Sequence, residues 1–141
     1  MVNTSQQDPG FQLSRFESSN LKLEPLSSMA EVPYHKSGYV NIKIINTSGY
    51  KINSLPDRNE PVMLSYRIYD LNGNLITRKQ VKTPLDVDIY TEYTQAVKVD
   101  DKLDSGDYLL LIDFITGEDK WWNCGTKIQL HIPGRSMWRW L

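Results

Sequence analysis

The run from Gly106 to Gly125 constrains the fold more than any other part of the chain, because it holds the longest apolar stretch in the sequence, GDYLLLIDFITGEDKWWNCG. In a strand, alternate residues share a face. One face would then carry Tyr108, Leu110, Ile112 and Phe114, and the other would carry Leu109, Leu111, Asp113 and Ile115. Since both faces are mainly apolar, the pattern predicts a strand in the middle of a sheet whose two sides are both at least partly covered.

The residues that lead into this strand, LDSGDY from Leu103 to Tyr108, have the form of the tyrosine corner of immunoglobulin-like sandwiches. In that motif a tyrosine at the start of the penultimate strand points its hydroxyl back to nearby backbone. We therefore expect the Tyr108 hydroxyl to hydrogen-bond a backbone group a few residues upstream.

The rest of the chain consists of short alternating segments separated by turn residues, with no helical period. We expect strands over residues 16–26, 39–46, 62–70, 75–82, 90–99 and 126–132, loops over 29–38 and 47–61, and a corner over 83–88. Asn72-Gly73 between two alternating runs predicts a hairpin. Inward positions are expected at Tyr93, Val97, Val99, Ile128, Leu130 and Ile132. The sequence thus predicts an all-β fold, an immunoglobulin-like antiparallel β-sandwich of about seven to nine strands.

Length and composition favour one soluble domain. We expect a flexible lead-in over residues 1–15, the β-sandwich over 16–133 and a tryptophan-rich tail over 134–141. The 16 lysines and arginines nearly balance the 17 aspartates and glutamates, which disfavours binding to nucleic acid or an anionic membrane. Cys124 is the single cysteine, and no segment has the pattern of a signal peptide or a membrane span, so a cytoplasmic location is expected.

The sequence lacks the parts that a self-contained catalytic site needs. His35 and His131 stand at no metal-ligand spacing from each other or from Cys124. There is no Gly-x-Ser-x-Gly elbow and no phosphate-binding loop. The aspartates over residues 100–107 do not match the helix-loop-helix calcium pattern and are interpreted as a solvated turn. We expect no enzyme activity, no metal and no cofactor.

Aromatic rings next to planar polar groups are the first candidate binding feature. Trp121 and Trp122 are adjacent, so in an extended segment they point to opposite faces and at least one should lie at the surface or under a loop. A surface indole flanked by Asn123 can stack on a sugar ring while the amide meets its hydroxyls. The alternative, that one indole closes the end of the sandwich and the other covers a loop, stays equally open.

A second candidate set follows from the strand assignment. One exposed sheet face would display Arg67, Tyr69, Asp113, Lys127, Gln129 and His131. Of these, Arg67, Tyr69, Asp113 and Gln129 could hydrogen-bond a glycan. The alternative for Arg67 and Asp113 is a simple salt bridge on a solvated sheet.

The carboxyl-terminal segment GRSMWRWL places Trp138 and Trp140 on one face of a possible further strand. Exposed tryptophans are costly, so we expect the segment to pack on a sheet, and Leu109, Leu111 and Ile115 on the outward side of the 106–116 strand form a fitting cover site. The partner strand would belong to the same chain or to a second copy, which favours a packed or strand-exchanged homodimer.

Several short segments together resemble a bacterial glycan-binding β-sandwich family, the carboxyl-terminal domain of the ATP-binding subunit of O-antigen polysaccharide ABC transporters. Similar modules accompany glycosyltransferases and methyltransferases of surface-glycan clusters. The segments are VNIKIINTSG (40–49), PVMLSYR (61–67), DLNG (70–73), TPL (83–85), GDYLL (106–110), IDF (112–114) and WW (121–122). The chain departs from the pattern in two places: relatives have Trp-Phe at 121–122, and the residues before Tyr39 match no part of it.

The resemblance implies a cytoplasmic, non-catalytic module that recognises the finished, often terminally modified end of a lipid-linked polysaccharide for export. It also implies a homodimer, a parent ATP-binding domain and a transmembrane transporter subunit as partners. The alternative function is a protein-interaction sandwich that uses the apolar outer sheet face and the tryptophan-rich tail.

Overall fold

The computed structural model describes residues 21–49, 51–53, 61–77, 81–116 and 120–134. All regular elements in these ranges are strands, and no helix there is long and apolar enough to cross a bilayer. The strands are β2 (Leu21–Pro25), β3 (Met29–Glu31), β4 (Gly38–Asn46), β5 (Ile52–Asn53), β6 (Val62–Tyr69), β7 (Thr83–Pro84), β8 (Asp86–Val87), β9 (Thr91–Val99), β10 (Gly106–Thr116), β11 (Lys120–Trp121) and β12 (Thr126–Ile132). The predicted all-β sandwich is confirmed. The predicted lead-in over residues 1–15 and residues 135–141 of the predicted tail lie outside the described ranges, and so do the domain boundaries expected there.

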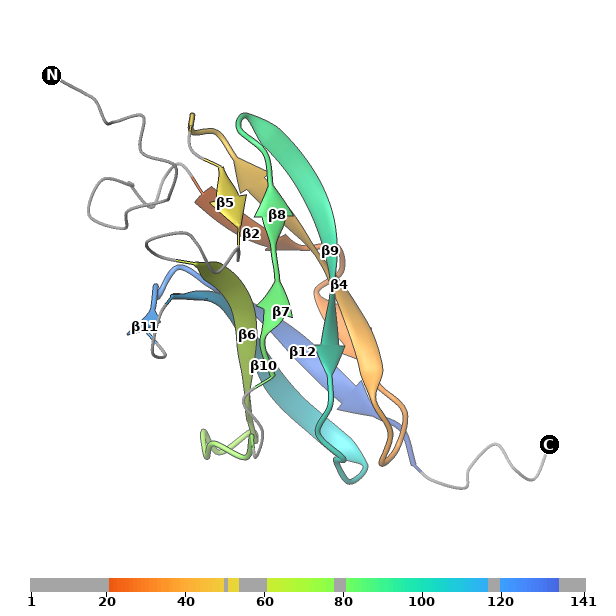
Figure 1. The fold of residues 1–141 in the computed structure, drawn as a ribbon. Coiled ribbons are helices and arrows are strands. Elements are labelled where there is room, and N and C mark those ends of the chain that lie inside the picture. The colour runs from red at the N-terminus through yellow and green to blue at the C-terminus, as the bar shows by residue number, and fades with distance from the viewer. Residues whose placement is uncertain (1–20, 50, 54–60, 78–80, 117–119, 135–141) are drawn as a thin grey trace, which may run out of the picture.

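Two packed sheets form the sandwich (Figure 1). The larger sheet has the order β3-β12-β10-β6-β7, with β11 attached to the far end of β10, and the smaller has the order β2-β4-β9. The strand from Gly106 is therefore central, as predicted, because β6 pairs with one of its edges and β12 with the other. A two-stranded sheet of β5 and β8 lies beside them.

The core lies between the two sheets and follows the period-two pattern. Leu110, Ile112 and Phe114 of β10 are fully buried, and so are the inward residues predicted for β12. Val40, Ile42 and Ile44 of β4 face them from the opposite sheet, with exposures of 4% or less. Burial of this continuous set of branched side chains is the main stabilising contribution to the fold.

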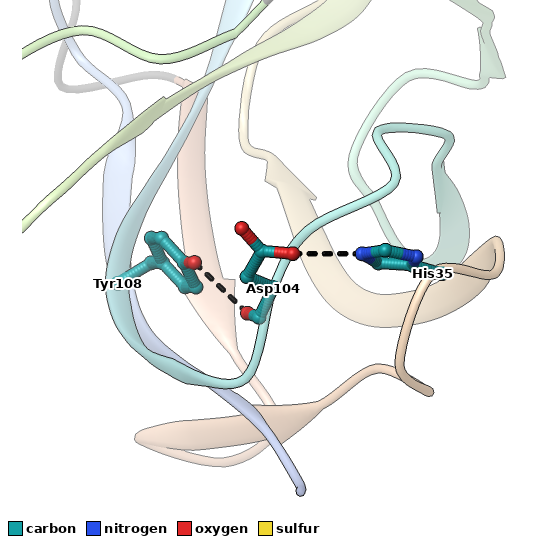
Figure 2. Close-up of polar contacts among 3 residues, drawn as sticks. All are labelled: His35, Asp104 and Tyr108. Carbon is teal, nitrogen blue, oxygen red and sulfur yellow. Dashed lines mark hydrogen bonds and ion pairs between the residues drawn. The ribbon is translucent and has the colours of Figure 1, made fainter. Parts of the chain in front are cut away.

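The tyrosine corner is present where the sequence predicted it (Figure 2). The Tyr108 hydroxyl donates a hydrogen bond to the backbone carbonyl of Asp104, over 2.9 Å. The side chain of Asp104 contacts His35 Nε2 at 2.8 Å, and the backbone N–H of His35 donates to the carbonyl of Leu103. The turn before β10 is thus fixed to its own strand and to the loop before β4.

The predicted turn at Asn72-Gly73 is also confirmed, and Asp70 organises it. The carboxylate of Asp70 accepts hydrogen bonds from the backbone N–H groups of Asn72 and Asn74, each over 2.9 Å. Gly73 has φ of 86°, which favours glycine. Beyond the turn, the described residues show a bridge between Tyr69 and Leu75 and a pairing of β6 with β7, while residues 78–80 of the expected second arm lie outside the description.

Several local expectations are wrong. The described residues of the expected strand over 75–82 show only a bridge at Leu75. The loop expected over 47–61 contains β5, and the corner expected over 83–88 contains β7 and β8. Met29–Glu31, expected to lie in a loop, forms β3 and pairs in parallel with β12. Tyr93, expected in the core, is 43% exposed because β9 is an edge strand that pairs only with β4. The core side of such an edge strand is covered incompletely by the opposite sheet.

Candidate functional site

The outer face of the larger sheet gathers most of the predicted site residues, in cross-strand rows. Leu111 pairs with Arg67 of β6 on one side and with Lys127 of β12 on the other. In the next row, Leu109 pairs with Tyr69 and Gln129. Adjacent strands lie about 4.8 Å apart, so the backbones of Arg67 and Lys127 are roughly 10 Å apart across β10. We call this surface the outer face.

The two adjacent tryptophans point in opposite directions, as the strand geometry predicted. Trp121 pairs with Ile115 at the far end of β10 and is half-buried. Trp122 packs against the core residue Phe114, with ring centroids 5.1 Å apart and an interplanar angle of 41°. Trp122 therefore helps to close the end of the sandwich, and Trp121 is the indole that belongs to the outer face.

Arg67 links β6 to the Trp121 indole. Its guanidinium carbon lies 4.0 Å from the centroid of the Trp121 ring, within the range of a cation–π contact. Because β6 and β11 pair with opposite edges of β10, the Arg67 side chain crosses β10 to make this contact. One face of the Trp121 ring is thereby covered by a planar, polar group.

The prediction that Asp113 lies exposed beside Arg67 is wrong, because Asp113 is only 2% exposed. Its carboxylate accepts hydrogen bonds from the backbone N–H groups of Phe114 and Asn123, both over 2.7 Å. Burial raises the pKa of Asp113, and these backbone hydrogen bonds and the nearby Arg67 charge oppose the rise. The structure records no ion pair between Arg67 and Asp113, so the alternative of a surface salt bridge is wrong too.

The turn between β11 and β12 is built on Asp113. Asn123 is exposed and has φ of 63°, a left-handed conformation that asparagine tolerates better than most residues. Gly125 is required by close approach, since a Cβ at this position would lie 2.2 Å from the carbonyl oxygen of Ile112. Asp113 is thus a positioning residue for the segment that carries Trp121 and Asn123.

Cys124 sits in the same turn as a half-buried thiol. Its Sγ lies 3.9 Å from a carboxylate oxygen of Asp113. Burial, with a contribution from the Asp113 charge, raises the pKa of the thiol to about 11. In this environment Cys124 fills space and stays a protonated thiol at neutral pH.

A hollow of about 440 Å³ lies on the outer face beside the Arg67 row. Its lining comes from three strands and from the turn after β6: Tyr69, Asp70, Leu71, Gly73, Leu109, Leu111 and Lys127. We call it the outer-face hollow. Sequence reasoning missed Lys127, Leu71 and Asp70 as site residues; the strand pattern placed Lys127 on this face, but no pattern indicated that the turn forms a wall.

The remaining predicted residues divide between this face and other places. Tyr69 is half-buried and lines the hollow, and Gln129 is exposed in the neighbouring row. Leu109 and Leu111, expected to be covered by the tail, are half-buried at the floor of the hollow. Ile115 needs no such cover, since it is 1% exposed within the described chain. Trp138 and Trp140 lie outside the described residues.

A larger hollow, of about 590 Å³, lies beside the tyrosine corner. Four aspartates contribute to its lining: Asp70, Asp100, Asp101 and Asp104. Asp104 contacts His35, Asp100 accepts a hydrogen bond from Ser37, and Asp70 holds its own turn. These three carboxylates therefore stabilise loops. Within the described ranges, no group of three or more histidine, cysteine, aspartate or glutamate side chains is arranged to hold a metal ion.

Comparisons with known proteins support the fold. No family model matches the sequence, and no curated protein matches it. Beta-glucosidase from Listeria innocua superposes over 81% of this chain with a TM-score of 0.53 and 12% identity, and this chain spans 16% of that enzyme. At 12% identity this likeness establishes the sandwich fold alone.

Two further solved structures superpose less well. They are the C-terminal domain of wzt, at 13% identity over 80% of this chain and 70% of that one, and a family 123 glycoside hydrolase from Clostridium perfringens, at 11% identity over 82% of this chain and 27% of that one. Their TM-scores of 0.49 and 0.47 add nothing to the fold assignment.

Proposed function

We propose that the protein is a non-catalytic carbohydrate-binding module and that the outer face is its binding surface. The observation that carries the proposal is the Arg67–Trp121 stack next to a hollow with a leucine floor. The volume of the hollow lies in the range of ligand sites, roughly 300–1,000 Å³. Such sites combine a mainly apolar lining with a few polar groups, and here Tyr69, Lys127 and Asp70 supply the polar groups.

A sugar ring matches this surface chemically. Its C–H groups pack against apolar or aromatic side chains, and its hydroxyls are met by planar or charged hydrogen-bonding groups. The Arg67 guanidinium is held over the Trp121 ring, so its N–H donors are restricted in position before a ligand arrives. Gln129 and Asn123 extend the row of polar groups on either side. A pre-organised surface of this kind loses less conformational entropy on binding.

The resemblance of the sequence to glycan-binding domains of O-antigen exporters supports a finer proposal. The ligand would be a bacterial surface polysaccharide, recognised for export, and the module would work in the cytoplasm beside an ATP-binding domain and a transmembrane subunit. A homodimer belongs to the same proposal. Because the sequence lacks recognisable catalytic motifs, we propose that the module binds the sugar without changing it chemically.

A protein-interaction role is the second candidate, and one observation favours it. Leu71 is 74% exposed at the rim of the outer-face hollow, next to the half-buried Leu109 and Leu111. Exposed apolar clusters of this kind also occur at protein interfaces.

Binding to immobilised bacterial polysaccharides, followed by ¹H–¹⁵N NMR titration with a bound oligosaccharide, tests the proposal. Shifts of the amides of Arg67, Leu111 and Lys127 are expected, with none at Asn41 and Ala96 on the outer side of the smaller sheet. Failure to bind any glycan, together with self-association that Leu71→Ser abolishes, would favour the protein-interaction role.

A further inference from the structure

The aliphatic floor of the outer-face hollow narrows the kind of sugar that fits it. Leu109 and Leu111 stand side by side on the outward side of β10, and each is half-buried. Leucine offers no hydrogen bond to a hydroxyl and no flat ring for stacking. It does make dispersion contacts with a methyl group, and it removes the apolar surface of that group from water.

Leu71, on the turn after β6, adds a third leucine to the lining of the hollow. It is 74% exposed, on a turn where a flexible apolar side chain would ordinarily fold back. The backbone of this turn is fixed, because the Asp70 carboxylate accepts hydrogen bonds from the backbone N–H groups of Asn72 and Asn74, and the N–H of Gly73 bonds to the Asp70 carbonyl over 3.0 Å. The hydrogen bonds to the carboxylate also lower the pKa of Asp70, with the Asn74 contacts making the largest contributions. A rigid wall therefore presents an apolar side chain next to an apolar floor.

The polar groups of the hollow lie at its margin. Tyr69 pairs with Leu109 from β6, and Lys127 pairs with Leu111 from β12, so the two polar side chains flank the leucine floor from opposite strands. A sugar seated here would direct hydroxyls to the margin and one apolar substituent to the floor. An ordinary hexose has no such substituent, because its exocyclic carbon carries a hydroxyl that the leucines would desolvate without a partner.

From this arrangement we propose that the outer-face hollow is a subsite for a sugar that bears a methyl-terminated substituent, either the C6 methyl of a 6-deoxyhexose or an acetyl group. The inference rests on the proposed function and adds the class of sugar. The shared chemistry is one methyl group buried among Leu71, Leu109 and Leu111. Burial of a group of this size favours the methyl-bearing sugar about fourfold to tenfold, since an apolar pocket rejects an added hydroxyl only weakly.

Matched pairs of glycosides with the same 2-aminoethyl aglycone test the proposal. The pairs are L-rhamnoside with L-mannoside, L-fucoside with L-galactoside, and N-acetylglucosaminide with glucoside. The first two pairs report on a C6 methyl and the third on an acetyl group. Affinity is measured by NMR titration, which also locates the ligand through the amides of Leu71, Leu109 and Leu111. We expect at least one methyl-bearing member to bind about fourfold to tenfold more tightly than its partner.

Leu71→Ser should remove most of that preference, because it should lower the affinity for the methyl-bearing sugar more than the affinity for its plain partner. The variant cannot unfold the protein by opening the core, because Leu71 is already exposed. Leu26→Ser, at a leucine that is 54% exposed after β2 in the other sheet, is the matched control and should keep the preference. Equal affinities within all three pairs, or a preference with shifts confined to residues 100–104, would overturn this inference while the carbohydrate-binding function stands. If neither these glycosides nor the immobilised polysaccharides bind, the proposed function fails as well.

Discussion

The Arg67 guanidinium carbon lies 4.0 Å from the centroid of the Trp121 ring, on a surface where no ion pair joins Arg67 to Asp113. Such a contact at a partly exposed site contributes about 0.5–1 kcal/mol. Arg67→Ala should therefore lower the free energy of unfolding by about that amount, measured by urea denaturation, and weaken glycan binding much more. Arg67→Lys should retain stability better than binding, because a lysine lacks the planar fork. Lys43→Ala, in the other sheet, is the control and should leave binding unchanged.

Substitution of Trp121 should mainly reduce glycan binding, whereas substitution of Trp122 should mainly reduce stability. Trp122→Ala removes a ring that packs on Phe114 and is expected to cost about 2–4 kcal/mol of folding free energy. Trp121→Ala should cost about 1 kcal/mol or less and should abolish most glycan binding. Thermal denaturation and NMR titration of both variants check this. The reverse pattern, with Trp122 needed for binding and Trp121 for stability, would contradict the assignment of Trp121 to the binding surface.

Asp113 should matter for both stability and binding without touching the ligand. Asp113→Ala leaves the buried N–H of Phe114 and the N–H of Asn123 without their acceptor, at a cost of about 1–3 kcal/mol each. We expect the amide signals of residues 121–125 to shift or broaden in the NMR spectrum of the unliganded variant. If that spectrum matches the wild type while binding is lost, Asp113 would have to contact the sugar directly.

Stability should fall at alkaline pH through the buried Tyr66 and the half-buried Cys124. Burial raises the pKa of Tyr66 from 10.0 to about 12, and burial with the Asp113 charge raises the pKa of Cys124 from 9.0 to about 11. A pKa that is higher in the folded state than in the unfolded state contributes stability that is complete below the unfolded pKa and is lost as the pH rises to the folded pKa. Unfolding free energy should therefore decline from pH 9 to pH 12. Cys124→Ala should remove the decline between pH 9 and 10 and reduce it between pH 10 and 11, where Tyr66 also contributes.

We expect the tyrosine corner to contribute to folding stability and not to glycan binding. Tyr108→Phe deletes the hydrogen bond to the Asp104 carbonyl and should cost about 0.5–1.5 kcal/mol. Chemical denaturation measures the cost, and glycan affinity should stay at the wild-type value. A loss of affinity in a variant that remains folded would indicate that the acidic hollow beside Tyr108 takes part in binding.

The sequence predicted the elements that depend on local pattern. Period-two alternation identified the buried side chains of β10 and β12, and Asn72-Gly73 identified the turn that now forms one wall of the hollow. The tyrosine corner and the opposite directions of Trp121 and Trp122 follow from the same local rules, so they could be predicted without knowledge of the neighbours.

Features that depend on distant neighbours could not be predicted in this way. Alternation assigned Asp113 to the outward side of β10, but its burial comes from the turn before β12, whose backbone the carboxylate holds. The contact of Arg67 with Trp121 crosses a strand, and no spacing in the sequence encodes it. Tyr93 was misjudged for the same reason, because period alone does not show that a strand lies at an edge.

The parallel pairing of β3 with β12 has a consequence for folding during synthesis. Gln129 pairs with Met29, a residue 100 positions earlier, so the larger sheet cannot be completed until β12 has emerged from the ribosome. Contacts of such wide sequence separation slow folding, because the entropy of closing the intervening chain is lost before the strands pair. Until then the unpaired edge of β10 stays available to chaperones and to neighbouring nascent chains, and the speed of translation past residue 132 should influence the yield of native protein.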